Sequence, residues 1–220
     1  MFTGFTPETI DFLWGIRMNN NREWFLEHKA QYTATLYEPM KALGQELFQP
    51  FLSRSGDVLK VSRIYRDARL HHAEPYKESL WICIRKDVEW WAENPCLYFE
   101  IRPEGVGSYG FPLGKPKAAT MEAFRRRLAA QPEEFLATLD SVQKALGMEV
   151  SAVCYKKPKE APQKELSPFY AWKEDISLTV HKPVGEDIFG PELGQRAKTF
   201  LEQLIPLYDY FNFVTQGLRE

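Results

Sequence analysis

Apolar positions at helical spacing occupy residues 6–50. Thr6 can cap a first helix, and Pro7 fits its first turn, where no backbone donor is missed. Asn20 resembles the cap of a second helix. The buried stripe of that helix is predicted to consist of Trp24, Phe25, His28, Tyr32 and Leu36. Pro39 should break or kink the helix, because proline lacks an N–H and crowds the carbonyl four residues earlier.

Over residues 57–113 the apolar positions alternate, which is typical of strands with one covered face. The two clearest strands carry Leu80, Ile82 and Ile84, and then Leu97, Phe99 and Ile101. The connection between them is too short for a crossover helix, so we expect residues 79–86 and 97–102 to be neighbouring antiparallel strands. Residues 108–113 are expected at an edge of the sheet, because Pro112 cannot donate to a strand ladder.

Helical spacing returns over residues 117–147, where Gly147 is suited to end the last helix. Residues 155–170 are rich in proline and lysine, have no periodicity and predict an exposed loop. One more strand and the final helices should lie within residues 175–215. We therefore predict an α+β fold in which residues 1–220 form a single domain. Its antiparallel sheet should be covered on one face by the N- and C-terminal helices.

Composition narrows the classes of function. The formal net charge is −2 and the isoelectric point is near 6.2, so nucleic acid is an unlikely partner unless a local basic patch exists. The three cysteines, Cys83, Cys96 and Cys154, form no C-x-x-C pair, so neither a disulfide framework nor a zinc site is indicated. The chain contains no apolar run of membrane-spanning length. We expect a soluble, cytoplasmic protein without a membrane partner, a metal or a cofactor.

Basic charge is concentrated in "RIYRDARLHHAEPYKE", residues 63–78. The guanidinium groups of this stretch could hold phosphate or carboxylate oxygens, because each presents a planar fork of donors. Asp67 could orient one arginine, Tyr76 could add a hydroxyl donor and Lys77 a point charge. The predicted ligand-binding residues are Arg63, Arg66, Asp67, Arg69, Tyr76 and Lys77. If they form a site, at least two of the three arginines should face a concavity shared with Lys77.

Structural ion pairs offer an alternative explanation, since acids such as Glu78 and Glu100 could simply neutralise these arginines. In a regular strand Arg63 and Arg66 would also point to opposite faces. The two could therefore converge only where the strand ends or bulges.

Signals for catalysis are weak. Asp67 and Glu100 are candidates for a general base, but the sequence contains neither a G-x-S-x-G nucleophile motif nor a phosphate-binding P-loop. His71 and His72 are adjacent and would point apart in an extended segment, so no metal site is predicted. Trp90 and Trp91 lie in a polar context and could contact a protein partner.

Three segments resemble a family of hypothetical proteins known only as a domain of unknown function. They read "GFTPETIDFLWGIRMNNNREWF", "RIYRDARLHHAEPYK" and "LYFEIRPEGVGSYGF", and "PEEFLATL" follows them. The resemblance implies one α+β domain and no known activity. Members typically read Arg-Phe-Ser-x-Asp-Lys-x-Pro-Tyr-Lys where this chain has an altered loop, His71–Glu74. Whatever this loop does in the family could be changed here.

Three classes of function remain open from the sequence. The first is a protein that binds a small anionic ligand, carrying phosphate or carboxylate, at a basic groove within residues 63–77. The second is an enzyme that acts on a phosphoryl or carboxyl ester at the same groove. The third is a protein-interaction module without a small ligand. The sequence leaves open whether the chain is an enzyme at all.

Overall fold

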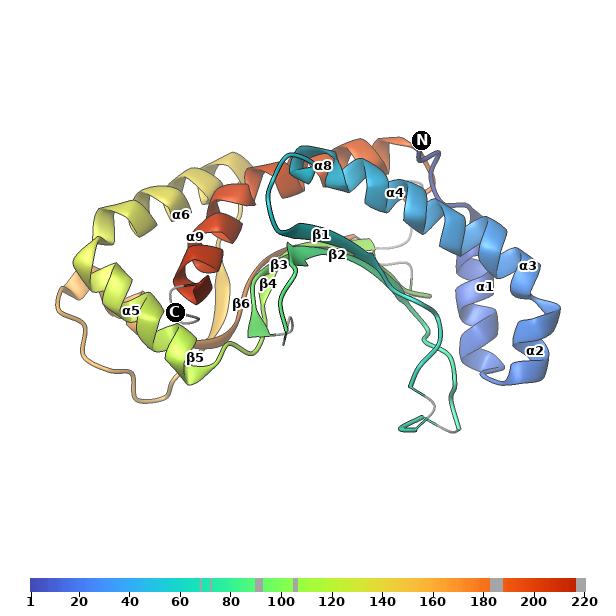
Figure 1. Ribbon diagram of the computed structural model, residues 1–220, viewed down its shortest axis with the longest axis horizontal. Helices are drawn as coiled ribbons and strands as arrows, with labels where there is room; N and C mark the ends of the chain where they lie inside the picture. Colours follow the sequence, from blue (N-terminus) through green and yellow to red (C-terminus); the bar gives the residue numbers. More distant parts are fainter. Residues whose placement is uncertain (68, 72, 90–92, 105–106, 183–187, 217–220) are drawn as a thin grey trace. The chain divides into compact units, whose positions relative to one another are not determined.

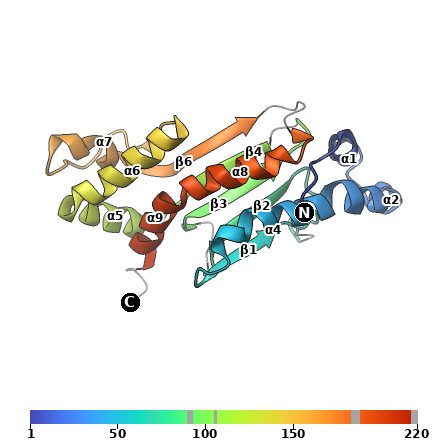
Figure 2. The same ribbon diagram turned by 90° about the horizontal axis from the view of Figure 1, so that it is seen from above.

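The protein has the α+β fold with an antiparallel sheet that the sequence predicts, and the described residues contribute six strands to this sheet (Figures 1 and 2). The computed structural model describes residues 1–67, 69–71, 73–89, 93–104, 107–182 and 188–216. The strand order is β1-β2-β3-β4-β6-β5. The strands are β1 (Asp57–Val61), β2 (Leu80–Lys86), β3 (Cys96–Ile101), β4 (Gly107–Leu113), β5 (Ser151–Cys154) and β6 (Trp172–Lys182).

Helices precede and follow the sheet strands along the chain. The longer helices are α1 (Pro7–Met18), α4 (Glu38–Phe48), α5 (Ala118–Ala130), α6 (Pro132–Leu146), α8 (Glu192–Gln203) and α9 (Ile205–Gln216). The shorter helical segments are α2 (Arg22–Glu27), α3 (Lys29–Gln31), η1 (Tyr32–Tyr37), η2 (Gln49–Phe51), η4 (Lys164–Leu166) and α7 (Ser167–Tyr170). Among the described residues, no helix has the length and apolar character needed to cross a membrane.

The chain forms two compact units. Unit 1 consists of Met1–Ile84, Tyr98–Tyr109 and Val180–Thr199. Unit 2 consists of Arg85–Leu97, Gly110–Thr179 and Phe200–Glu220. In unit 1, α4 packs on β1, where Gly44 lets the helix approach Leu59 and Val61 (Figure 1). In unit 2, the ring of Phe211 on α9 stacks 5.8 Å from that of Phe111 on β4.

The helix that contains Pro39 does not break there. Instead, the chain makes a wider π-helical turn, η1, immediately before α4. Proline cannot donate to the carbonyl four residues earlier, which belongs to Thr35. That carbonyl accepts a hydrogen bond of 2.6 Å from the hydroxyl of Thr9, a fully buried residue of α1. The hydrogen bond that proline cannot make is thus replaced by a contact between α1 and η1.

The predicted buried stripe is largely confirmed. Phe25, Tyr32 and Leu36 are buried, whereas Trp24 and His28 are half-buried and stack with ring centroids 3.9 Å apart. The predicted cap is off by one residue. Asn21 caps α2, since its side-chain oxygen accepts from the backbone N–H of Trp24 at 3.0 Å. The side chain of the predicted cap, Asn20, instead bonds the backbone of Tyr76.

The two strands read most clearly from the sequence are neighbours, as predicted. Their predicted core positions, Leu80, Ile82, Ile84, Leu97, Phe99 and Ile101, are all buried. In unit 1, Phe99 stacks on Phe5 with ring centroids 6.1 Å apart. The alternating pattern therefore placed the covered face of β2 and β3 correctly.

The edge prediction for residues 108–113 is wrong, because β4 lies inside the sheet between β3 and β6. Pro112 is the second-to-last residue of β4, so the donor that it lacks falls near the end of the ladder. Gly110 lies against the backbone of Leu178 on β6, where an added Cβ would come within 2.1 Å of the carbonyl oxygen. The edges are β1 and β5 instead, and β5 was not predicted as a strand.

Unit 2 has a core of aromatic side chains. The ring of Phe124 on α5 stacks on Trp172 of β6 at 5.8 Å and meets Phe135 of α6 edge-on at 5.1 Å. Gly147 ends α6 in the left-handed conformation, with φ of 61°, as predicted. The predicted loop 155–170 is exposed only in its first part, because η4 and α7 bury Leu166 and Tyr170.

Candidate functional site

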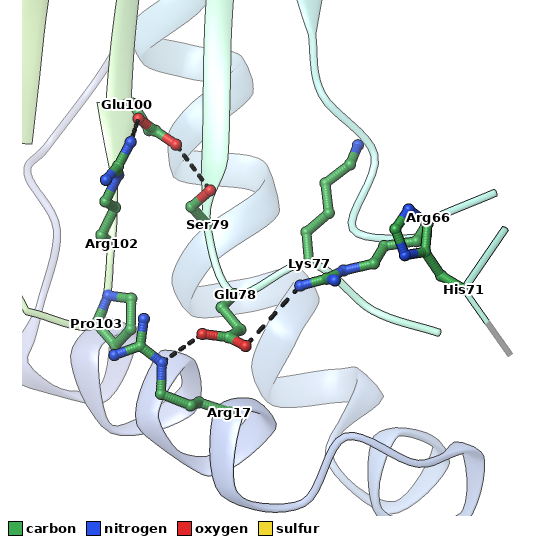
Figure 3. A pocket seen from close by; sticks show the side chains of 9 residues that line it. All are labelled: Arg17, Arg66, His71, Lys77, Glu78, Ser79, Glu100, Arg102 and Pro103. Atoms are coloured by element: carbon green, nitrogen blue, oxygen red, sulfur yellow. Dashed lines mark hydrogen bonds and ion pairs between the residues drawn. The ribbon is translucent and has the colours of Figure 1, made fainter. Parts of the chain in front are cut away.

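A pocket of about 400 Å³ lies entirely within unit 1 (Figure 3). It is lined by Arg17, Arg66, His71, Lys77, Glu78, Ser79, Glu100, Arg102 and Pro103. These side chains come from α1, from the connection between β1 and β2, and from the end of β3 with the residues that follow it. Three segments that are distant in the sequence thus meet at one concavity.

The connection between β1 and β2 folds back on itself next to the pocket. The backbone N–H of Arg66 donates to the carbonyl of Pro75 at 2.8 Å, and that of Lys77 donates to the carbonyl of Ile64 at 2.7 Å. Tyr65 and Tyr76 form an antiparallel bridge between these two bonds. This ladder fixes the backbone from which the Arg66 and Lys77 side chains reach the pocket.

Asn20 holds the ladder against the N-terminal helices. Its side-chain amide donates to the carbonyl of Tyr76 at 2.9 Å, and its side-chain oxygen accepts from the N–H of Tyr76 at 3.0 Å. The ring of Tyr76 is buried and stacks on Phe25 of α2, with centroids 4.3 Å apart. The asparagine side chain therefore bonds Tyr76 as a neighbouring strand would.

Glu78 joins two arginines at the pocket. It accepts from the Nε of Arg17, and its Oε1 lies 3.8 Å from the Nη2 of Arg66 (Figure 3). Arg17 also donates to Glu104, and Arg66 donates to Glu74 at 3.3 Å. The bond from Arg17 holds the pKa of the Glu104 carboxyl below its usual range. The two arginines are therefore paired, although neither is buried.

A second ion pair lies at the end of β3. One oxygen of Glu100 accepts from the Nη2 of Arg102 at 2.6 Å, and the other accepts from the Ser79 hydroxyl at 2.8 Å. The hydrogen bond to Glu100 raises the pKa of Arg102. Figure 3 shows this group on one side of the pocket and the Arg66, His71 and Lys77 side chains on the other.

Lys77 differs from the arginines of the pocket. Its ammonium donates to the carbonyl of Arg63 at 2.8 Å and lies 5.8 Å from the ring centre of Trp81. Among the residues that the structure describes, no carboxylate pairs with it. Partial burial lowers the pKa of Lys77, and the neighbouring charge of Arg66 acts in the same direction. Lys77 is the pocket's least compensated cation.

Of the six predicted binding residues, the structure brings only Arg66 and Lys77 to the pocket. The side chains of Asp67 and Arg69 pair with each other through two bonds of 3.0 and 2.6 Å. Arg63 is not among the lining residues, although its carbonyl accepts from Lys77, and Tyr76 is packed against Phe25. This pocket therefore brings one of the three arginines, Arg66, together with Lys77, and the expectation of a second stays a prediction.

Two of the arginines that line the pocket were not predicted from the sequence. Arg17, Arg102 and Ser79 were not predicted, Glu78 was considered only as an ion-pair partner, and Glu100 was considered as an ion-pair partner or a base. A usable signal existed. Arg17 and Arg102 both lie in segments that carry the family resemblance, although nothing in the sequence showed that these segments meet.

Other sequence predictions concern residues outside this pocket. His71 lines it, but no group of three or more His, Cys, Asp and Glu side chains in the described ranges could hold a metal ion. His72, Trp90 and Trp91 lie outside the described residues. The predicted protein contact at the two tryptophans stays a prediction.

The fold and the site together define an α+β protein. Its unit 1 has a charged pocket beside the connection between β1 and β2 and the end of β3. Residues 8–210 match the family of conserved hypothetical proteins DUF2461, and the chain belongs to this family. The resemblance predicted from the sequence is thereby confirmed. No curated protein matches the chain closely enough to count as a relative.

Proposed function

We propose that the pocket of unit 1 binds a small anionic ligand through Lys77 and Arg66. The observation that carries this proposal is the Lys77 ammonium, which lines a pocket of about 400 Å³ without a carboxylate partner among the described residues. A half-buried cation is costly to leave uncompensated, and a phosphate or carboxylate oxygen would satisfy its remaining donors.

Arg66 supports the same proposal. Its contacts to Glu74 and Glu78 are 3.3 and 3.8 Å long, longer than the 2.7–2.9 Å that is usual for charge-assisted hydrogen bonds. A guanidinium group has five N–H donors, so an anion can bind without displacing either carboxylate. Arg66 and Lys77 could therefore bind the same anion, the first through a planar guanidinium group and the second through an ammonium group.

The experiment is a thermal-shift and calorimetric screen with inorganic phosphate, sulfate and short mono- and dicarboxylates. The parent chain should gain melting temperature with at least one anion, and Arg66→Ala and Lys77→Ala should each lose most of this gain. Arg69→Ala is the matched control, because Arg69 lies in the same connection but pairs with Asp67. Equal losses in all three variants, or no shift with any anion, would contradict the proposal.

Catalysis at this pocket remains the alternative from the sequence. Asp67 is paired with Arg69 and does not line the pocket, so Glu100 is the remaining candidate base. Because Glu100 already accepts from Arg102 and Ser79, its geometry supports binding rather than proton abstraction. Turnover of phosphoesters or carboxyesters by the parent chain, lost in Glu100→Gln, would favour the enzyme instead.

A further inference from the structure

The pocket contains acceptors as well as cations. Glu78 and Glu100 both line it, and an ionised carboxylate has about four lone-pair positions for donors. Glu100 uses one position on each oxygen, for Arg102 and for Ser79. The Oε1 of Glu78 lies 3.8 Å from Arg66, which is an ion-pair distance but too long for a hydrogen bond. Both carboxylates thus keep acceptor capacity toward a ligand.

The charges around the pocket limit how negative the ligand can be. The lining carries four cations, Arg17, Arg66, Lys77 and Arg102, against Glu78 and Glu100. Glu104 pairs with Arg17, and Glu74 pairs with Arg66. Four positive and four negative groups leave the described charges balanced. A highly charged anion would therefore meet as many carboxylates as cations.

We propose that the ligand is a hydroxylated anion, a sugar phosphate or a sugar acid. Its anionic group would bind Lys77 and Arg66, and its hydroxyl groups would donate to Glu78 and Glu100. This inference rests on the proposed function, because it names the class of ligand for the same pocket. A volume of about 400 Å³ is within the range of small-molecule sites and admits a ligand of monosaccharide size.

Hydroxyl groups suit these acceptors better than an ammonium group. Glu78 already lies between Arg17 and Arg66, and Glu100 is bonded to Arg102. An ammonium placed against either carboxylate would be close to an arginine of like charge. A hydroxyl brings a donor without a net charge, so it can use the free lone pairs without that repulsion.

The first test uses matched ligand pairs on the parent chain, with dissociation constants measured by isothermal titration calorimetry. Glucose 6-phosphate is compared with inorganic phosphate, and gluconate is compared with hexanoate. The hydroxylated member of at least one pair should bind at least tenfold more tightly than its plain partner. Which pair shows the larger ratio distinguishes a phosphate from a carboxylate as the anionic group.

The second test assigns the preference to Glu100. In Glu100→Gln the ratio between hydroxylated and plain ligand should fall at least fivefold, because one acceptor becomes a donor. Glu104→Gln is the matched control, since it removes a negative charge near Arg17 from a residue outside the pocket lining. This control should change the affinities for both members of a pair by a similar factor and leave the ratio unchanged.

The outcomes separate the two proposals. If plain and hydroxylated anions bind equally well, or if glucosamine 6-phosphate binds more tightly than glucose 6-phosphate, the hydroxylated class is wrong and anion binding stands. If none of these probes binds the parent chain, both proposals fail. The ligand pairs need no variant, so they decide the question even if Glu100→Gln does not fold. An unchanged ratio in a folded Glu100→Gln would also overturn the assignment.

Discussion

Two arginines, one in each unit, have contrasting surroundings. Arg125 of α5 is 5% exposed, and its Nε and Nη2 donate to the backbone carbonyls of Tyr170 and Trp172 at 3.2 and 2.7 Å. Arg66 lines an open pocket and makes ion-pair contacts of 3.3 and 3.8 Å. Buried hydrogen bonds to backbone carbonyls mark a structural arginine, whereas ion pairs to exposed or half-exposed carboxylates at a concavity leave donors for a ligand.

The surroundings of Arg125 explain its role. The end of α7 and the start of β6 leave two carbonyls near α5 that need donors, and burial keeps water from supplying them. Tyr170 returns a bond from its hydroxyl to the carbonyl of Arg125 at 3.2 Å. This reciprocal contact joins α5 to α7, so Arg125 connects elements that are distant in the sequence.

The largest effect should come from Arg125→Ala. The substitution leaves two buried carbonyls without donors, and each such loss costs about 1–3 kcal/mol, so the free energy of unfolding should fall by about 3 kcal/mol. Urea unfolding followed by circular dichroism measures this. Arg126→Ala, at an exposed position of the same helix, should change stability by less than about 0.5 kcal/mol. Similar values for the two variants would remove the basis of the comparison.

A smaller loss is expected for Asn20→Ala, which tests whether the pocket's backbone is held by Asn20 and not by Arg66. Two bonds to the backbone of Tyr76 disappear, so stability should fall by about 2 kcal/mol. The amide of Tyr76 should also exchange faster with deuterium. Asn20→Asp keeps the acceptor and loses the donor, so it should lie between Asn20→Ala and the parent. An unchanged exchange rate of the Tyr76 amide would show that the ladder is stable without the bonds to Asn20.

Arg66→Ala should be nearly neutral for folding, within about 0.5 kcal/mol, because half-exposed ion pairs contribute little to stability. Its anion affinity should nevertheless fall about tenfold or more, as a charge-assisted bond to the ligand is lost. Urea unfolding and calorimetry on the same preparation measure both quantities. A stability loss as large as that of Arg125→Ala would make Arg66 a structural residue.

The smallest effect concerns pH and separates Lys77 from the arginines of the pocket. Burial lowers its pKa from 10.5, so the ammonium is present below the lowered pKa and is lost as pH rises through it. Anion affinity should therefore decline with rising alkaline pH before pH 10.5. Lys77→Arg should abolish this decline, because arginine stays protonated. Calorimetric titrations with the anion at several pH values test this. An anion affinity that is independent of pH up to 10.5 would show that Lys77 does not bind the anion.

Sequence patterns predicted local features best. The alternation in residues 80–101 identified two buried strand faces, and Gly147 marked the end of α6. Predictions that depended on one residue type were weaker. Pro112 suggested an edge strand, yet β6 arrives later in the chain and pairs with β4. Pro39 suggested a break or kink, and the helix becomes irregular just before it, where Thr9 supplies a hydrogen bond from another helix. In both cases a distant segment satisfied the backbone.

The site divides in the same way. The sequence by itself determined that basic charge gathers in residues 63–78, since this is a property of neighbouring residues. Only the tertiary structure decided which cations face the pocket. In the structure Arg69 pairs with Asp67, whereas Arg17 and Arg102 line the same pocket as Lys77. Side chains from three separate segments converge there, and a linear pattern of charges contains no information on which carboxylate each arginine will meet.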